Sequence, residues 1–274
     1  MTSKLREQLI DWAETYNDPV YFAEDPIAFP RKFFDAGASL QDIEIAAVFA
    51  AHLAWGRRAM IVRDCTRLFD EMEWRPLDYI LAHDYRNDPT SLHRTVKWSE
   101  IAAICERLYR FYLSDDRPVP PETVSLSLDP TASAVPPLMV PRVAQVPGAQ
   151  GCSSVRSIEE LRVGQIRTLI FGQKEDPKAA NKKINMMRRW MVRDDGKVDL
   201  GLWKDTDPST LLIPLDVHVH EVALQLGLTS RKSKDIMTVK DITESFSEIF
   251  PSDPCKGDFA LFGYGVTHPG EKQH

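Results

Sequence analysis

Two segments of the chain contain the residue types that chemistry at a glycosidic bond uses. Lys182 and Lys183 begin a segment with a helical pattern and further cations, and a lysine amine is a nucleophile once it is neutral. Burial and neighbouring positive charge both lower a lysine pKa. Asp216 follows the apolar run Leu211 to Leu215 and precedes another helical pattern, which predicts an ionised N-cap. Such an amine could attack the anomeric carbon of a nucleoside while the carboxylate stabilises positive charge on the sugar.

Each motif also has a plain structural explanation. Aspartates are common N-caps, so Asp216 could do no more than cap its helix. Runs of like charge are usually solvated, so Lys182 and Lys183 could belong to a basic surface or contact phosphates. The sequence leaves these alternatives open.

The charge distribution favours one segment for nucleic-acid contact. The chain as a whole is acidic, with a formal net charge of -6, but binding depends on local charge. Residues 178–193 carry six cations and no acid. The cations are Lys178, Lys182, Lys183, Arg188, Arg189 and Arg193. We therefore expect this segment to contact DNA phosphates in a salt-dependent way.

Composition excludes several other classes of protein. Of the 274 residues 43% are hydrophobic, but no apolar run approaches the ~20 residues that span a bilayer. The beginning of the chain lacks the apolar stretch of a signal peptide, so we expect a cytoplasmic protein with no membrane partner.

The four cysteines are scattered without a CxxC pair, which argues against a disulfide framework or a cysteine metal site. We expect no cofactor, no metal and a monomer.

Helical periodicity dominates the chain and predicts an all-α fold. No sustained alternating strand pattern and no internal repeat is present. Five of the expected helices cover residues 5–16, 43–55, 101–112, 184–192 and 217–226. Ser39 and Asp42 form a capping box before the second, the fourth has a basic outer face, and Gly227 ends the fifth. Three more helices are expected to begin at Ser157 with Glu160, at Thr238 with Asp241, and at Asp253 with Pro254.

One segment interrupts the helical pattern. Residues 114–150 contain eight of the nineteen prolines, and proline removes backbone donors and stops helices. We expect a long irregular connection there. It divides the chain into an N-terminal helical part (1–113), a connection (114–156) and a C-terminal helical part (157–274) that holds the lysine and the aspartate.

The residues around Asp216 resemble a known group of enzymes. Pro214 to Val219 is similar to the Pro-Val-Asp-Val-His segment of 8-oxoguanine DNA glycosylases, within the helix-hairpin-helix glycosylase superfamily. The segments 42–55, 182–193, 213–219 and 258–265 also resemble a bacterial family of uncharacterised function that has been linked to that superfamily. The archaeal 8-oxoguanine glycosylase branch is the nearer likeness, because it shares a long gap between lysine and aspartate.

The resemblance implies a fold and roles for single residues. It implies two helical subdomains with a cleft between them, and damaged double-stranded DNA as the partner. Lys182 matches the lysine that forms a Schiff base in bifunctional glycosylases, with Lys183 as its competitor, and Asp216 matches the catalytic aspartate. His218 matches a histidine near the DNA backbone. A flipped-out base needs a pocket, for which the candidate walls are His52, Trp55, Trp190, Phe259 and Phe262.

The chain departs from the glycosylase pattern before Lys182, and other functions stay open. Residues 176–181 contain no glycine, although the familiar hairpin holds a phosphate with glycine N–H groups. One alternative is a nucleic-acid-binding protein of the same fold without catalysis, and a plainer one is a helical interaction module. A metal-dependent hydrolase using Asp216, His218 and His220 is a third, but residues two apart do not face together on a helix.

Overall fold

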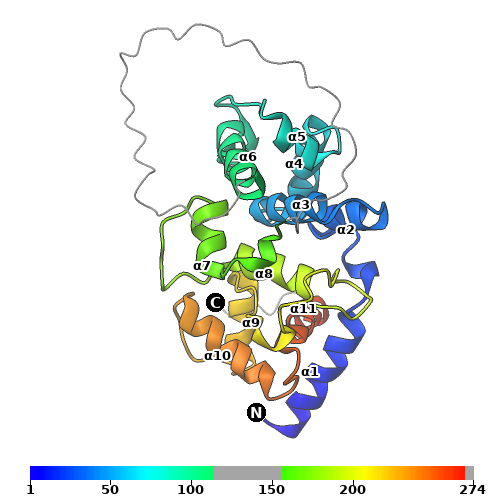
Figure 1. The fold of residues 1–274 in the computed structure, drawn as a ribbon. Coiled ribbons are helices and arrows are strands. Elements are labelled where there is room, and N and C mark those ends of the chain that lie inside the picture. The colour runs from blue at the N-terminus through cyan, green and yellow to red at the C-terminus, as the bar shows by residue number, and fades with distance from the viewer. Residues whose placement is uncertain (114–155, 269–274) are drawn as a thin grey trace, which may run out of the picture.

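The computed structural model describes residues 1–113 and 156–268, and these residues form a predominantly helical protein (Figure 1). The all-α prediction is confirmed at this level. The helices are α1 (Ser3–Tyr16), α2 (Ala28–Asp35), α3 (Leu40–Leu53), α4 (Arg58–Glu71), α5 (Pro76–Ala82), α6 (Trp98–Leu113), α7 (Val163–Gln165), α8 (Lys182–Val192), α9 (Val217–Gln225), α10 (Ile236–Ser247) and α11 (Gly257–Thr267). The predicted irregular connection lies, except for Arg156, outside the described residues.

The helices gather in two groups with α8 between them. Figure 1 shows α2 to α6 in the upper part of the molecule, and α1, α9, α10 and α11 in the lower part. Although α1 begins the chain, it packs along α11. At Gly263 a Cβ atom would lie 2.2 Å from the Tyr16 ring, so the two helices approach closely because this residue has no side chain.

Helix α3 is the central element of the upper group, as its almost uninterrupted apolar sequence predicts. Ser39 caps it by accepting a hydrogen bond from the Asp42 N–H at 3.1 Å, which confirms the predicted start. Beyond the first turn of this helix the one acid is Glu44, which is fully buried. Its carboxylate accepts hydrogen bonds from Trp203 Nε1 at 2.8 Å and from the Ile158 N–H at 3.0 Å. Glu44 therefore ties α3 to segments that follow the proline-rich connection.

A short hairpin joins α5 to α6, and the sequence patterns did not predict it. Strand β1 (Ser91–His93) pairs antiparallel with β2 (Val96–Lys97), with His93 opposite Val96. Both strands are too short to produce an alternating pattern of several residues. Helices α2, α4 and α5 were also absent from the prediction.

The segment after the connection differs from the prediction of one continuous helix. Ser157 and Glu160 do form a capping box, but it opens only a 3₁₀ turn, Ile158–Glu160. The backbone becomes extended at Leu161 and Arg162 before α7 and a π-helical turn, Ile166–Ile170. Ile166 and Ile170 in this turn are both buried in the core.

The C-terminal helices start close to the predicted positions, with one shift. Helix α10 begins at Ile236 rather than at Thr238, because Asp235 accepts hydrogen bonds from Met237 N and Thr238 N. A short 3₁₀ turn, Pro254–Lys256, precedes α11, as the Asp253–Pro254 pair suggests.

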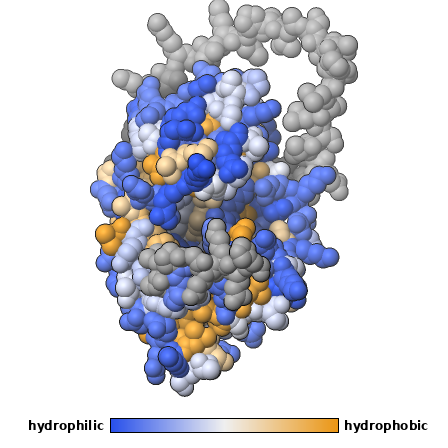
Figure 2. All heavy atoms as spheres, turned by 180° about the vertical axis from the view of Figure 1, so that it is seen from behind, coloured by the Kyte–Doolittle hydropathy of each residue, from blue (hydrophilic) through white to orange (hydrophobic). Residues whose placement is uncertain are grey.

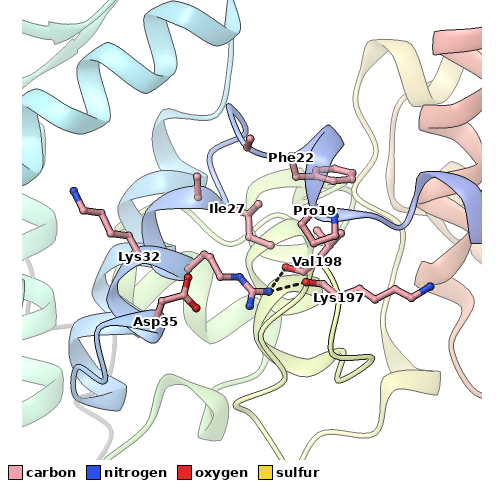
Figure 3. A pocket seen from close by; sticks show the side chains of 10 residues that line it. Pro19, Phe22, Ile27, Lys32, Asp35, Lys197 and Val198 are labelled. Atoms are coloured by element: carbon pink, nitrogen blue, oxygen red, sulfur yellow. Dashed lines mark hydrogen bonds between the residues drawn. The ribbon is translucent and has the colours of Figure 1, made fainter.

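A loop after α8 connects the two groups. The Arg31 side chain on α2 donates to the carbonyl oxygens of Val198 at 2.6 Å and Lys197 at 3.1 Å (Figure 3). A shallow hollow of about 530 Å³ lies beside this contact and is lined by residues such as Phe22, Ile27 and Lys32. Neither Lys182 nor Asp216 lines it.

The surface seen from behind is mainly hydrophilic, and hydrophobic residues gather toward its lower end (Figure 2). Among the helices of residues 1–113 and 156–268, none combines the length and apolar character needed to cross a membrane.

Candidate active site at the starts of helices α8 and α9

The structure brings Lys182 and Asp216 together at the beginnings of two helices. Lys182 is the first residue of α8, and Asp216 is the N-cap of α9, where its carboxylate accepts the Val219 N–H at 2.9 Å. Lys182 Nζ lies 4.0 Å from Asp216 Oδ2. The two side chains are 30% and 38% exposed, so both are within reach of a ligand.

The Lys182 amine has a second partner at the end of α3. It donates a hydrogen bond to the carbonyl oxygen of Ala54 at 2.9 Å. The last carbonyl groups of a helix have no partner within the helix and carry its negative end. This contact fixes the amine between the C-terminus of α3 and the N-terminus of α9.

Lys183 points to a different place. Its Nζ lies 3.0 Å from His52 Nδ1 and 4.2 Å from the centre of the Phe171 ring, on which His52 is also stacked. Burial and the nearby charge of Arg167 lower the pKa of Lys183 to about 8. Burial and the Lys183 ammonium lower the pKa of His52 to about 3, so the imidazole is neutral. His52 Nε2 is buried without a hydrogen-bond partner in the described part of the chain.

A further carboxyl group, Asp25, lies near this site. It accepts a hydrogen bond from the Ile27 N–H at 3.2 Å, and its Oδ2 lies 3.8 Å from Arg58. Burial raises the pKa of the Asp25 carboxyl, while the charges of neighbouring cations, including Lys182, oppose that rise. Sequence patterns gave no signal for Asp25, because it lies in a loop far from Lys182 in the chain.

The prediction of a basic outer face on α8 is wrong for Arg189 and Arg193. Arg189 is 5% exposed and pairs with Asp199 and Asp258, and Arg193 is 1% exposed and pairs with Asp199 and Asp253. These cations are stable in the interior because each is paired with acids from the following loop and from the C-terminal helical part. Neither guanidinium is available for DNA phosphates in this structure.

The other predicted DNA contacts differ in exposure. Lys178 is exposed in the loop before α8, and Arg188 is partly buried, with its pKa lowered by that burial. His218 is 86% exposed on α9 and lies 3.9 Å from Glu221. These three residues remain candidates for contacts with a charged ligand.

The proposed walls of a base pocket are not brought together in one cavity. Trp190 and Phe259 have no exposed surface, and Phe259 packs against Phe22 at 5.4 Å between ring centres. Phe262 is partly buried and also packs against Phe22, at 5.3 Å between ring centres. Trp190 and Phe259 are therefore core residues. His52, near the end of α3, lies beside Lys183, and Trp55 follows Ala54, whose carbonyl oxygen accepts from Lys182.

The histidines of the metal alternative diverge. His218 points to solvent, whereas His220 is buried and its Nε2 lies 2.8 Å from the Arg231 carbonyl oxygen. No group of three or more His, Cys, Asp or Glu side chains with metal-binding geometry occurs within residues 1–113 and 156–268.

A basic surface on α4 was missed in the sequence. Arg57 and Arg58 begin this helix, and Arg63 and Arg67 follow on it, all with exposed side chains. Asp64 lies among them but is fully buried. Residues 57–67 carry four arginines and one acid. A count of charged residues in this window of the sequence would therefore have revealed the surface.

Comparison with known proteins places the chain in one family. No curated protein and no solved structure matches it. A family model described as "Protein of unknown function (DUF2400)" matches residues 25–267, which include the segments around Lys182 and Asp216. The chain belongs to the DUF2400 family.

Proposed function

We propose that this protein is a DNA base-excision glycosylase with AP-lyase activity. Lys182 is the nucleophile and Asp216 the catalytic carboxylate. The observation that supports this most directly is the 4.0 Å separation between Lys182 Nζ and Asp216 Oδ2, with both side chains partly exposed. An amine and a carboxylate at this distance can act on the same sugar carbon.

The reaction follows from what the two groups can do. The amine of Lys182 first gives up a proton to water, and its lone pair then forms a bond to C1′ of the damaged nucleoside. The bond between C1′ and the base breaks, and its electron pair leaves with the base, which takes up a proton. The Asp216 carboxylate stabilises the positive charge that builds on the sugar. Opening of the sugar ring converts the adduct to an imine, the Schiff base that precedes strand cleavage.

The surroundings favour Lys182 over Lys183 as the nucleophile. The low pKa of Lys183 would suit a nucleophile, but its amine is directed at His52 and the Phe171 ring. Asp216 forms its ion pair with Lys182. Since attack on a sugar needs the carboxylate beside the same carbon, geometry outweighs the protonation state.

Borohydride trapping tests this proposal. An imine between protein and DNA is reduced to a stable amine, so incubation with abasic or oxidised-base DNA and borohydride should yield a covalent complex. We expect the complex to be lost in Lys182→Gln and retained in Lys183→Gln. Loss in Lys183→Gln alone would move the nucleophile to Lys183, and the absence of any complex or base release from the unaltered protein would refute the proposal.

A nucleic-acid-binding protein without catalysis is the second candidate. One observation favours it: the Lys182 amine has both the Ala54 carbonyl and the Asp216 carboxylate as partners. Both partners stabilise an ammonium ion, as expected for a structural ion pair. Salt-sensitive DNA binding without a trapped complex would support this alternative.

A further inference from the structure

Trp55 is a large aromatic residue whose side chain stays exposed. It directly follows Ala54, whose carbonyl holds the Lys182 amine. The residue is 37% exposed, whereas Trp98, Trp190 and Trp203 are buried. The Arg94 guanidinium lies 4.5 Å from the centre of the Trp55 ring. Arginine stacked on tryptophan is a favourable cation–π arrangement, and it places a planar cation on an exposed ring.

A buried histidine fixes the position of Trp55. His93 is completely buried; its Nδ1 lies 2.8 Å from Asp64 Oδ2 and its Nε2 lies 2.9 Å from the Trp55 carbonyl oxygen. Both ring nitrogens thus have a hydrogen-bond partner, one on α4 and one in the backbone of Trp55. The His93 ring also meets the Trp55 ring edge to face at 5.4 Å. Trp55 is held in a defined orientation, which reduces the entropy that binding a ligand would cost.

Gly56 makes room for the arginine. Its φ angle of +102° is rare for residues with a side chain, and a Cβ atom there would lie 2.6 Å from Arg94 Nη1. The absence of a side chain therefore allows Arg94 to lie across the Trp55 ring.

The surface around Trp55 is positively charged. Arg57 is exposed, and within the described residues neither it nor the Arg94 guanidinium forms an ion pair. Arg63 and Arg67 on α4 share the buried Asp64 with His93. Exposed aromatic rings flanked by cations are the combination with which proteins bind nucleic-acid strands whose bases are unstacked.

We propose that Trp55 and Arg94 form a stacking surface for an unpaired nucleobase of the bound nucleic acid. A paired and stacked base exposes no face to such a surface, whereas an unpaired base can stack on it while Arg57 meets its phosphate. The substrate class that fits is DNA with an unpaired base close to the nucleoside that reaches Lys182. This inference rests on the proposed function because it takes DNA as the ligand.

The test compares two labelled DNA duplexes of the same sequence, one fully paired and one with a single-base bulge, by fluorescence anisotropy. We expect the unaltered protein to bind the bulged duplex about tenfold more tightly, within the usual range for stacking of one base. Trp55→Ala and Arg94→Ala should each remove this preference, and Trp55→Phe should keep most of it. Equal affinity of the unaltered protein for both duplexes, or a preference that survives in Trp55→Ala, would overturn the proposal.

A matched control is available on α2. Phe34 is also 37% exposed and also has an arginine, Arg31, over its ring at 5.6 Å. Phe34→Ala should leave the preference for the bulged duplex unchanged, and a loss equal to that of Trp55→Ala would contradict a specific stacking surface. Lys182→Gln should abolish borohydride trapping and keep the preference. If the unaltered protein is trapped by borohydride but binds both duplexes equally, only the stacking surface is refuted. If it prefers the bulged duplex but is not trapped, only the glycosylase proposal is refuted.

Discussion

Lys182 Nζ and Asp216 Oδ2 lie 4.0 Å apart, and each residue stands at the start of its own helix, α8 or α9. The N-terminus of a helix carries partial positive charge, so the Asp216 carboxylate is stabilised by its own helix and by the lysine amine together. The same carboxylate caps α9 and is partly exposed. Its capping and its proposed catalytic role can be separated by substitution.

Replacing Asp216 should separate capping from catalysis. Asparagine is as good an N-cap as aspartate, so Asp216→Asn should change the free energy of unfolding by only a few tenths of a kcal/mol. Asp216→Ala should cost about 1 kcal/mol, because the Val219 N–H loses its acceptor. Both variants should lose borohydride trapping. Trapping at the normal rate in a folded Asp216→Asn protein would exclude the carboxylate from the reaction.

Lys183 should make stability depend on pH in the alkaline range. Its pKa falls from 10.5 in the unfolded chain to about 8 in the folded protein. Between these values the unfolded state binds the extra proton, so the free energy of unfolding should rise with pH, by up to roughly 3 kcal/mol.

Urea unfolding at several pH values measures this effect. Lys183→Met should flatten the rise, whereas Lys178→Met, at an exposed position, should keep it. An identical pH dependence in the Lys183→Met protein would show that Lys183 is not the group that titrates.

Arg193 should contribute to stability and not to DNA contact. The guanidinium is almost completely buried, and the charges of Asp199 and Asp253 keep its pKa above the usual value. Arg193→Met removes the partner of Asp253 and leaves Asp199 with Arg189 alone, and we expect a loss of about 3–5 kcal/mol in the free energy of unfolding. Chemical denaturation measures the loss. The exposed Lys178→Met variant should stay within about 0.5 kcal/mol, so equal effects would contradict the buried position of Arg193.

Gly56 should tolerate a side chain poorly for two reasons. Gly56→Ala forces a residue with a Cβ atom to a φ of +102° and displaces Arg94, which should cost about 1–3 kcal/mol. Gly37 has a φ of +68° but open space around it, so Gly37→Ala should cost less. In an Arg94→Ala background the cost of Gly56→Ala should fall as well. Thermal unfolding of the unaltered protein, the three single variants and the Arg94→Ala, Gly56→Ala double variant checks this. An unchanged cost in the Arg94→Ala background would exclude the Arg94 contact as a cause.

The sequence alone determined the fold class and most of the long helices. Local signals suffice there: an apolar face at helical spacing predicted α1, α6 and α9, and the Ser39 and Asp216 caps marked two helix starts correctly. The motif around Asp216 also singled out the aspartate that the structure places beside Lys182. These features depend on residues within one or two helical turns, so no knowledge of distant contacts is needed.

The tertiary structure decided which of the charged and aromatic residues face outward. Arg189 and Arg193 look like a solvated basic face in the sequence, but their partners Asp258 and Asp253 lie 69 and 60 residues further along the chain, so only folding reveals these pairs. Exposure of Trp55 likewise depends on contacts from the β1–β2 hairpin, which places His93 and Arg94 around it. Burial and ion pairing are properties of segments that meet in space, and local periodicity carries no information about which segments meet.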